Sequence, residues 1–176
     1  MYETLLSKYG IKQVGYYVKS IEETAENMAK MLGAGPFFDM GVNPPAELEY
    51  RGKKSESLTR CALGHFKDIQ IELIEVANDE PNVYEELGHY GMHHLCIWAD
   101  DTEKVAKEFV DAGFEVAMEM TSGQGLKVVY IDAREQLGSF IEVNAPLEQL
   151  YMGIKMHHEN WDGTRPLRTM ADLMGR

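Results

Sequence analysis

The sequence contains an internal repeat, and this repeat constrains the fold more than any other feature. Gln13-Val-Gly-Tyr-Tyr-Val18 superimposes on His94-Leu-Cys-Ile-Trp-Ala99 after a shift of 81 positions. The stretch after each segment has helical spacing, and each half ends in an Ile-Glu-aliphatic strand, at Ile71-Glu-Leu73 and at Ile141-Glu-Val143. Repeated units of this kind stack to share one core. The repeat predicts two strand–helix–strand–strand–strand modules, with eight strands and with helices covering one face of the sheet.

Local patterns give the expected elements. A capping box at Ser20 and Glu23 opens the first helix, Gly33 ends it, and Asp101 caps its counterpart. In the first half we expect strands over 11–18, after Gly35, and over about 56–63 and 68–76. In the second half we expect them over 92–99, 115–120, 127–132 and 139–144. Asn144 reads as the N-cap of a third helix, and the tail over 161–168 has turn chemistry.

The predicted organisation is α+β, with helices on one face of a mixed sheet, whose other face is concave or paired. We expect a single domain over 1–145, with module one over 11–77 and module two over 92–145. A C-terminal helix and tail over 146–176 would follow it. At 176 residues the chain suits one domain or two small modules that share a core.

The composition excludes several classes of partner. The formal net charge of −12 opposes binding to nucleic acid and to anionic membranes. No apolar run approaches the roughly 18 residues that span a bilayer, and the N-terminus lacks the pattern of a signal peptide. The two cysteines, Cys61 and Cys96, form no disulfide framework, which is typical of a reducing compartment. These features predict a cytoplasmic protein.

Four polar residues occupy matching places in the two halves, and all four are of types that bind metals. Gln13 and His94 lie near the start of the first strand of each half, and Glu72 and Glu142 lie in the last strand. A carboxylate in the middle of an apolar strand is costly to bury unpaired, and one divalent cation would compensate two of them. Oxygen donors with one imidazole suit a site for Zn, Ni, Co, Mn or Mg.

Four motifs together resemble the vicinal oxygen chelate superfamily, also called glyoxalase/bleomycin-resistance/dioxygenase. The motifs are Lys12-Gln-Val-Gly-Tyr-Tyr-Val18, Ile71-Glu-Leu-Ile-Glu-Val76, Gly91-Met-His-His-Leu-Cys-Ile97 and Phe140-Ile-Glu-Val143. The resemblance covers about residues 11–145. It implies two modules that form a curved, cup-like mixed sheet around one divalent metal ion, and a homodimer.

Two branches of this superfamily are most similar. The Gly91–Ile97 motif looks like that of methylmalonyl-CoA epimerases, in which the second histidine, here His94, is the ligand. The ligands of eukaryotic glyoxalase I would map onto Gln13, Glu72, His94 and Glu142. Gln13 departs from the epimerases and the bacterial glyoxalases, which carry histidine there.

The resemblance implies a lyase or isomerase that moves a proton on the carbon beside a carbonyl. The substrate would be a small carbonyl compound or a thioester. Glu142 is the first choice for the base, and Glu72 is the other candidate catalytic carboxylate. Glu49 and Glu56 are alternatives for a second acid or base. Arg51, Lys53, Lys54 and Arg60 could bind the anionic part of a coenzyme A or glutathione substrate, or they could form a solvated surface.

Two other functions stay open. A binding protein of the bleomycin-resistance type would use the same cup without catalysis, with or without a metal. A ring-cleaving dioxygenase needs two histidines and one carboxylate for iron, and Gln13 argues against it.

The remaining histidines are expected to have structural rather than functional roles. We expect His93 to pack on the helix side of its strand, His65 and His89 to lie in turns, and the adjacent His157 and His158 to be solvated.

Overall fold

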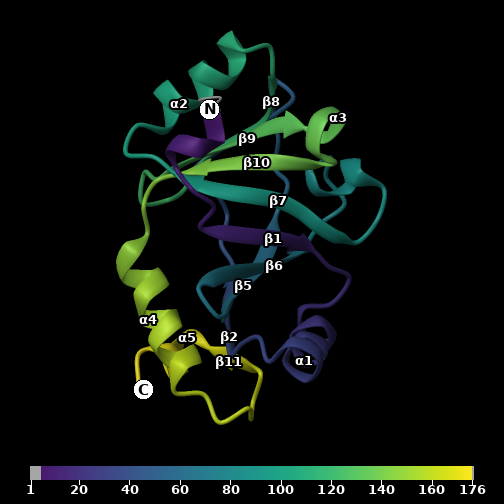
Figure 1. The fold of residues 1–176 in the computed structure, drawn as a ribbon. Helices are drawn as coiled ribbons and strands as arrows, with labels where there is room; N and C mark the ends of the chain where they lie inside the picture. The colour runs from purple at the N-terminus through teal and green to yellow at the C-terminus, as the bar shows by residue number, and fades with distance from the viewer. Residues whose placement is uncertain (1–4, 176) are drawn as a thin grey trace.

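The computed structural model describes residues 5–175, and its centre is one curved, mixed sheet (Figure 1). Its eleven strands run in the order β11-β2-β5-β6-β1-β7-β10-β9-β8-β3-β4. The strands of the first half are β1 (Gln13–Tyr17), β2 (Phe37–Val42), β3 (Glu47–Tyr50), β4 (Lys53–Lys54), β5 (Thr59–Phe66) and β6 (Ile69–Val76). Those of the second are β7 (Gly91–Trp98), β8 (Glu115–Thr121), β9 (Lys127–Ala133), β10 (Ser139–Asn144) and β11 (Leu167–Thr169).

The sheet contains two equivalent four-stranded units. The first has the order β2-β5-β6-β1 and the second the order β8-β9-β10-β7. In each unit the first and last strands pair in parallel, β1 with β6 and β7 with β10. The units meet where β1 and β7 pair antiparallel. The predicted fold class is therefore confirmed, and the strands with the four candidate ligands lie side by side at the centre.

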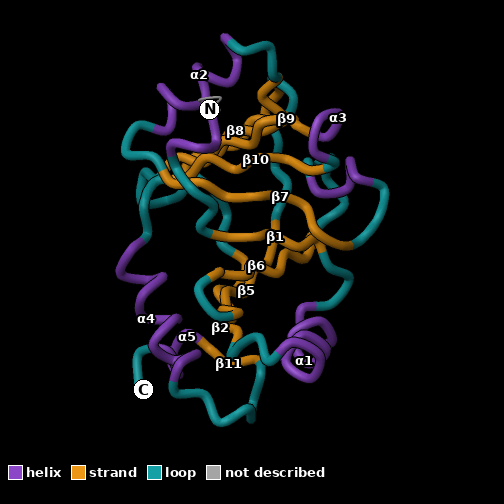
Figure 2. The backbone as a smooth tube through the Cα atoms, viewed as in Figure 1, coloured by secondary structure: helices purple, strands orange, loops and turns teal. Residues whose placement is uncertain are grey.

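The helices and short helical turns lie around the sheet (Figure 2). They are η1 (Leu5–Lys8), α1 (Ile21–Leu32), η2 (Tyr84–Leu87), α2 (Thr102–Asp111), α3 (Arg134–Leu137), α4 (Glu148–Glu159) and α5 (Met170–Leu173). Ser20 and Asp101 cap α1 and α2 as predicted, because each side chain accepts the backbone N–H of the third residue of its helix. Among the described helices, none is both long and apolar enough to cross a bilayer.

The two repeated helices cover the outer face of the sheet with separate apolar clusters. Ile21 and Ala25 of α1 pack in a cluster with Leu73 of β6. Val105 and Phe109 of α2 pack in a second cluster with Ile97, Ile131, Ile141 and Val143. Since these sheet residues face outward, alternation directs Glu72 and Glu142 to the opposite, concave face.

Three strands were not predicted. β3 and β4 form a hairpin inserted between β2 and β5, and β3 pairs with β8 of the other half. β11 pairs in parallel with β2, although its segment has turn chemistry in the sequence. These strands are two to four residues long, too short for alternation to reveal them.

α4 lies against the concave face, unlike α1 and α2. Ile154 is fully buried with Phe38 and Leu63, and Leu150 packs against the same cluster. The prediction that Asn144 caps this helix is wrong. α4 begins at Glu148 after Leu147, and Asn144 is the last residue of β10. The helix thereby closes one side of the cup, next to the four candidate ligands.

Candidate metal centre

Gly15 makes room for the central histidine of the site. It is aligned with Glu72 on one side, through β6, and with His94 on the other, through β7. A Cβ atom at position 15 would lie 2.0 Å from Cε1 of His94 and 2.3 Å from its Nε2. The imidazole therefore lies directly over the backbone of Gly15, and only glycine permits this position.

Three of the four predicted ligands converge. One ligand atom from each of Glu72, His94 and Glu142 lies within 4.8 Å of the others. Nε2 of His94 is 2.8 Å from Oε2 of Glu142 and 3.5 Å from Oε2 of Glu72. The His94 side chain is fully buried, and those of Glu142 and Glu72 are 5% and 16% exposed. The cluster is thus largely shielded from water.

Gln13 lines the same cavity as Glu72 and Glu142, and its side chain is buried. Its amide nitrogen donates a hydrogen bond to Oε1 of Gln70 at 2.9 Å. The amide oxygen of Gln13 is therefore the atom left to act as a ligand. Gln13 therefore lines the cavity beside the cluster, and its role as the fourth ligand stays a prediction.

Burial and the neighbouring charges shift the pKa of His94 in opposite directions. Burial disfavours a charged His94, but the carboxylates of Glu142 and Glu72 outweigh it and raise the pKa of His94 to about 9. Burial also raises the pKa of Glu72, while its contact with His94 acts against that rise. In the metal-free protein His94 is therefore an imidazolium between two acidic groups.

His93 does not lie on the helix side of β7, contrary to the prediction. The register between β1 and β7 shifts after Gly15, so that Tyr16 faces Met92 and His93 has no partner residue on β1. The bulge turns His93 toward the concave face, where its ring stacks on Phe140 at 4.8 Å. Alternation assigned the wrong face because a single extra residue interrupts it.

The position of His93 determines which nitrogen of His94 is available. Nε2 of His93 is 3.2 Å from the carbonyl oxygen of Val83, so this nitrogen must carry a proton and donate it. Burial lowers the pKa of His93 to about 3, so the ring is neutral and its Nδ1 is an acceptor. Nδ1 of His94, at 3.1 Å, donates to it. Nε2 of His94 then holds the lone pair that a metal needs, once its proton leaves.

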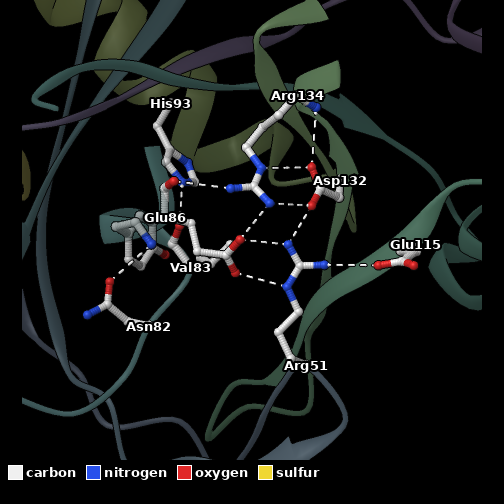
Figure 3. A network of polar contacts seen from close by, with 9 residues as sticks. Arg51, Asn82, Val83, Glu86, His93, Glu115, Asp132 and Arg134 are labelled. Atoms are coloured by element: carbon white, nitrogen blue, oxygen red, sulfur yellow. Dashed lines mark hydrogen bonds and ion pairs between the residues drawn. The ribbon is translucent and has the colours of Figure 1, made fainter. Parts of the chain in front are cut away.

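A network of charged side chains holds the turn that presents the Val83 carbonyl (Figure 3). The guanidinium of Arg51 binds both carboxylate oxygens of Glu86, at 2.9 and 2.7 Å, and also contacts Asp132. Arg134 joins Asp132 and Glu86 at 2.7 Å and lies over the ring of Phe140. The hydrogen bonds that Asp132 accepts, chiefly from Arg134 and also from Arg51, hold the pKa of Asp132 well below its usual range. These ion pairs join η2 to the turn after β3, to β9 and to α3.

A small cavity of about 60 Å³ adjoins the cluster. Its polar lining residues are Gln13, Gln70, Glu72, Glu142 and Asn144. Its apolar and aromatic lining residues are Leu63 and Trp98, which neighbour Glu72 and Asn144 in the sheet, and Leu147, Leu150 and Tyr151, which come from α4 and the residue before it. The cavity therefore combines candidate ligands with apolar and aromatic groups.

The donor set fits a divalent cation. Nε2 of His94 and Oε2 of Glu142 are buried and have no well-directed hydrogen bond among the described residues, although they lie close together. Two carboxylates, an amide oxygen and one imidazole are suitable ligands for Zn, Ni, Co, Mn or Mg. A cation would satisfy these buried atoms and neutralise the two carboxylates.

Several other candidate residues lie elsewhere. Glu49 is exposed on β3 opposite Lys54, and Glu56 is exposed before β5, so neither joins the cluster. Arg51 is committed to the network above, and Arg60 binds Asp39 and Glu22. Neither arginine lines the cavity.

Three of the remaining histidines also differ from their predictions. His65 is a fully buried residue of β5 rather than a turn residue. His158 is not simply solvated, because its two ring nitrogens contact the backbone at Gly35 and Lys67. His157 packs against Phe38. These histidines pack between α4 and the sheet, and none of them belongs to the cluster of candidate ligands.

Sequence reasoning missed three residues beside the cluster. Gln70 orients Gln13, Asn144 donates to Oε1 of Glu142 at 3.0 Å, and His93 orients His94. Gln70 and Asn144 were detectable, since each lies two residues from a predicted ligand on the same strand and therefore on the same face. His93 was not, because the bulge leaves no mark in the sequence.

Comparison with solved structures finds the same fold at low identity. A hypothetical protein from Bacillus halodurans C-125 is 18% identical, with a TM-score of 0.57, over 80% of this chain and 96% of that one. Methylmalonyl-CoA epimerase from Mycobacterium tuberculosis is 17% identical, with a TM-score of 0.55, over 86% of this chain and 96% of that one. No curated protein matches the sequence.

Residues 12–130 match the family model of the Glyoxalase/Bleomycin resistance protein/Dioxygenase superfamily. The matched region contains Gln13, Glu72 and His94, and Glu142 follows shortly after its end. It covers more than half of the chain, and the solved structures above share the arrangement of strands. The chain therefore belongs to the glyoxalase/bleomycin resistance protein/dioxygenase superfamily.

Proposed function

We propose that this protein is a divalent-metal-dependent lyase or isomerase that moves a proton on the carbon beside a carbonyl group. Gln13, Glu72, His94 and Glu142 would hold the metal. The observation that carries this proposal is the convergence of Glu72, His94 and Glu142 within 4.8 Å at the centre of the sheet. A bound divalent ion supplies Lewis acidity toward a substrate oxygen.

Glu142 is the proposed base. Asn144 donates to its Oε1, which fixes the carboxylate and directs Oε2 toward His94 and the cavity. This carboxylate would take the proton from the substrate carbon and return it. Glu72, on the opposite side of His94, is the second carboxylate able to carry a proton, and burial already raises its pKa.

The apolar wall supports this chemistry by excluding water. Trp98, Leu147 and Leu150 line the cavity together with the carboxylates. In such a low-dielectric site the attraction between a cation and a developing negative charge is stronger than in water. Proton transfer beside a carbonyl benefits directly, because it creates an oxyanion.

The test is exchange of the substrate's carbon-bound proton with D2O, followed by proton NMR on the metal-loaded protein. The panel should contain a coenzyme A thioester, a glutathione hemithioacetal and uncharged hydroxyketones. For the substrate that exchanges, we expect Glu142→Gln to lower the rate at least about 100-fold. Glu135→Gln, at an exposed glutamate, is the matched control. An unchanged rate in Glu142→Gln would remove the proposed base.

A binding protein without catalysis is the second candidate. The 2.8 Å contact between His94 and Glu142 favours it, since this ion pair stabilises the cluster without a cation. A purified protein that binds a small molecule but takes up no divalent ion would support this alternative. An iron dioxygenase is less consistent, because the described cluster contains one histidine and two carboxylates, and His93 points its nitrogens elsewhere.

A further inference from the structure

The cavity beside the cluster presents two amide groups that the proposed metal site does not use. The side chain of Gln70 lines the cavity and is 4% exposed, and its Nε2 has no hydrogen-bond partner among the described residues. Oδ1 of Asn144 is also buried and unpartnered in the described chain. Unpaired buried polar groups are costly, so a ligand that pairs with both would be stabilised.

The hydrogen bonds of these two amides decide which polar group of each remains free for a ligand. Oε1 of Gln70 accepts from Gln13, so the free group of Gln70 is an N–H donor. Nδ2 of Asn144 donates to Glu142, so its free group is an acceptor. The cavity therefore presents one donor and one acceptor beside the ligand cluster. A complementary ligand would therefore carry an oxygen that accepts a hydrogen bond, such as a carbonyl, and a hydroxyl that donates one.

The size of the cavity limits the ligand. A volume of about 60 Å³ has room for only about four to six water-sized groups. Leu147, Leu150 and Tyr151 close it on the side of α4. Tyr151 is itself held, because its hydroxyl donates to the carbonyl oxygen of Asp68 and its ring packs edge-on against His65. The wall is thus tied to the sheet at both β5 and the turn before β6.

The charge of the cavity limits the ligand further. Its described lining contains two carboxylates, Glu72 and Glu142, and no lysine or arginine. A divalent cation would bring this charge close to neutral, so an anionic ligand would find no cation of its own. A phosphate or carboxylate is therefore disfavoured relative to an uncharged molecule.

We propose that this cavity binds a compact, uncharged hydroxycarbonyl compound of about three or four carbon atoms, held by the Gln70 amide N–H and by Oδ1 of Asn144. This inference rests on the proposed function and deepens it by naming the substrate class. In the reaction, the C–H bond on the hydroxyl-bearing carbon breaks and Glu142 takes the proton. In D2O a deuteron then returns to the same carbon, so that exchange occurs without net change.

Hydroxyacetone is the probe, and the full-length metal-loaded protein is the sample. Saturation-transfer NMR measures its binding, and proton NMR in D2O measures KM and kcat for exchange. Gln70→Glu keeps the oxygen that accepts from Gln13 and removes only the N–H donor, so we expect it to raise KM about tenfold while the metal is retained. Gln149→Glu, at an exposed glutamine of α4, is the matched control and should retain the wild-type KM. Leu150→Ala should admit a longer hydroxyketone that the wild-type protein rejects.

The outcomes separate this inference from the proposed function. Exchange of a coenzyme A thioester or a hemithioacetal, without binding of hydroxyacetone, would overturn the inference and leave the proposed function standing. Binding of hydroxyacetone without exchange would overturn the assignment of this compound class as the substrate, and only a lack of exchange with every compound of the panel would also contradict the proposed function. A wild-type KM in Gln70→Glu, or no binding of hydroxyacetone, would overturn the inference.

Discussion

At the scale of single residues, Gly15 determines whether the cluster can form. We predict that Gly15→Ala displaces the imidazole of His94, because the new methyl group would lie 2.0 Å from its Cε1. The free energy of unfolding should fall by about 1–3 kcal/mol, as is usual for an overpacked core. Metal affinity should fall as well, which isothermal titration measures.

Gly123→Ala is the control for this prediction. Gly123 is exposed, and a Cβ at that position would have no neighbour within 4 Å. Both metal affinity and stability should stay at the wild-type level in the control. A Gly15→Ala protein with unchanged metal affinity would show that His94 does not need its position over the backbone.

The buried His65 should make the free energy of unfolding depend on pH. Burial lowers its pKa from 6.5 to about 4, so the unfolded chain binds a proton more readily than the folded chain between these values. Stability is therefore lost as the pH falls through this range, by about 2 kcal/mol between pH 7 and pH 5.

Urea unfolding at both pH values tests the contribution of His65. His65→Phe keeps a ring against Tyr151 but removes the titrating group, so the variant should lose about 2 kcal/mol less than the wild-type protein on acidification. His89→Gln, at an exposed histidine, should behave like the wild type. Equal losses in His65→Phe and the wild type would assign the acid sensitivity to other groups.

At the scale of elements, the repeat predicted the strands that carry the site, and the bulge in β7 limited what alternation could show. The matching segments at Gln13 and His94 became β1 and β7, which pair at the centre of the sheet. The faces of Glu72 and Glu142 followed from alternation because β6 and β10 are regular. His93 did not follow, since a bulge depends on the partner strand and not on the local sequence.

The elements outside the repeat were predictable only in part. A helix after Glu142 could be expected from its apolar stripe, but its place on the concave face depends on packing with Phe38 and Leu63. The β3–β4 hairpin could not be predicted, because its position is decided by pairing with β8 far along the chain. Tertiary contacts override local pattern in such short strands.

The bulge itself leads to a prediction. His93→Phe keeps the ring stack on Phe140 but removes the acceptor for Nδ1 of His94. We expect metal affinity to fall about 10- to 100-fold, as for other groups that orient a histidine ligand. His93→Gln retains a donor and an acceptor and should restore part of the affinity. Nitrogen-15 NMR of the histidine rings should show Nδ1 of His94 protonated in the wild-type protein, and an equal metal affinity in His93→Phe would contradict this role.

At the scale of the whole molecule, pseudo-symmetry explains why Glu72, His94 and Glu142 meet although they lie far apart in the chain. Pairing of β1 with β7 joins the two units, and each unit contributes one glutamate from its last strand. We propose that residues 1–145 form the shared domain and that 146–176 close its cup through α4. Homodimer formation stays a prediction that light scattering would test.

The central claim is that Gln13, Glu72, His94 and Glu142 form one divalent-metal site. Its most direct test is elemental analysis of the purified, dialysed protein, together with Glu72→Gln and Glu142→Gln. The wild-type protein should retain about one divalent ion per chain, because three donors converge in a buried site whose cavity Gln13 also lines. Each variant should retain far less while remaining folded. A wild-type chain that takes up no divalent ion, even when zinc, nickel, cobalt, manganese and magnesium are each supplied, would contradict the account.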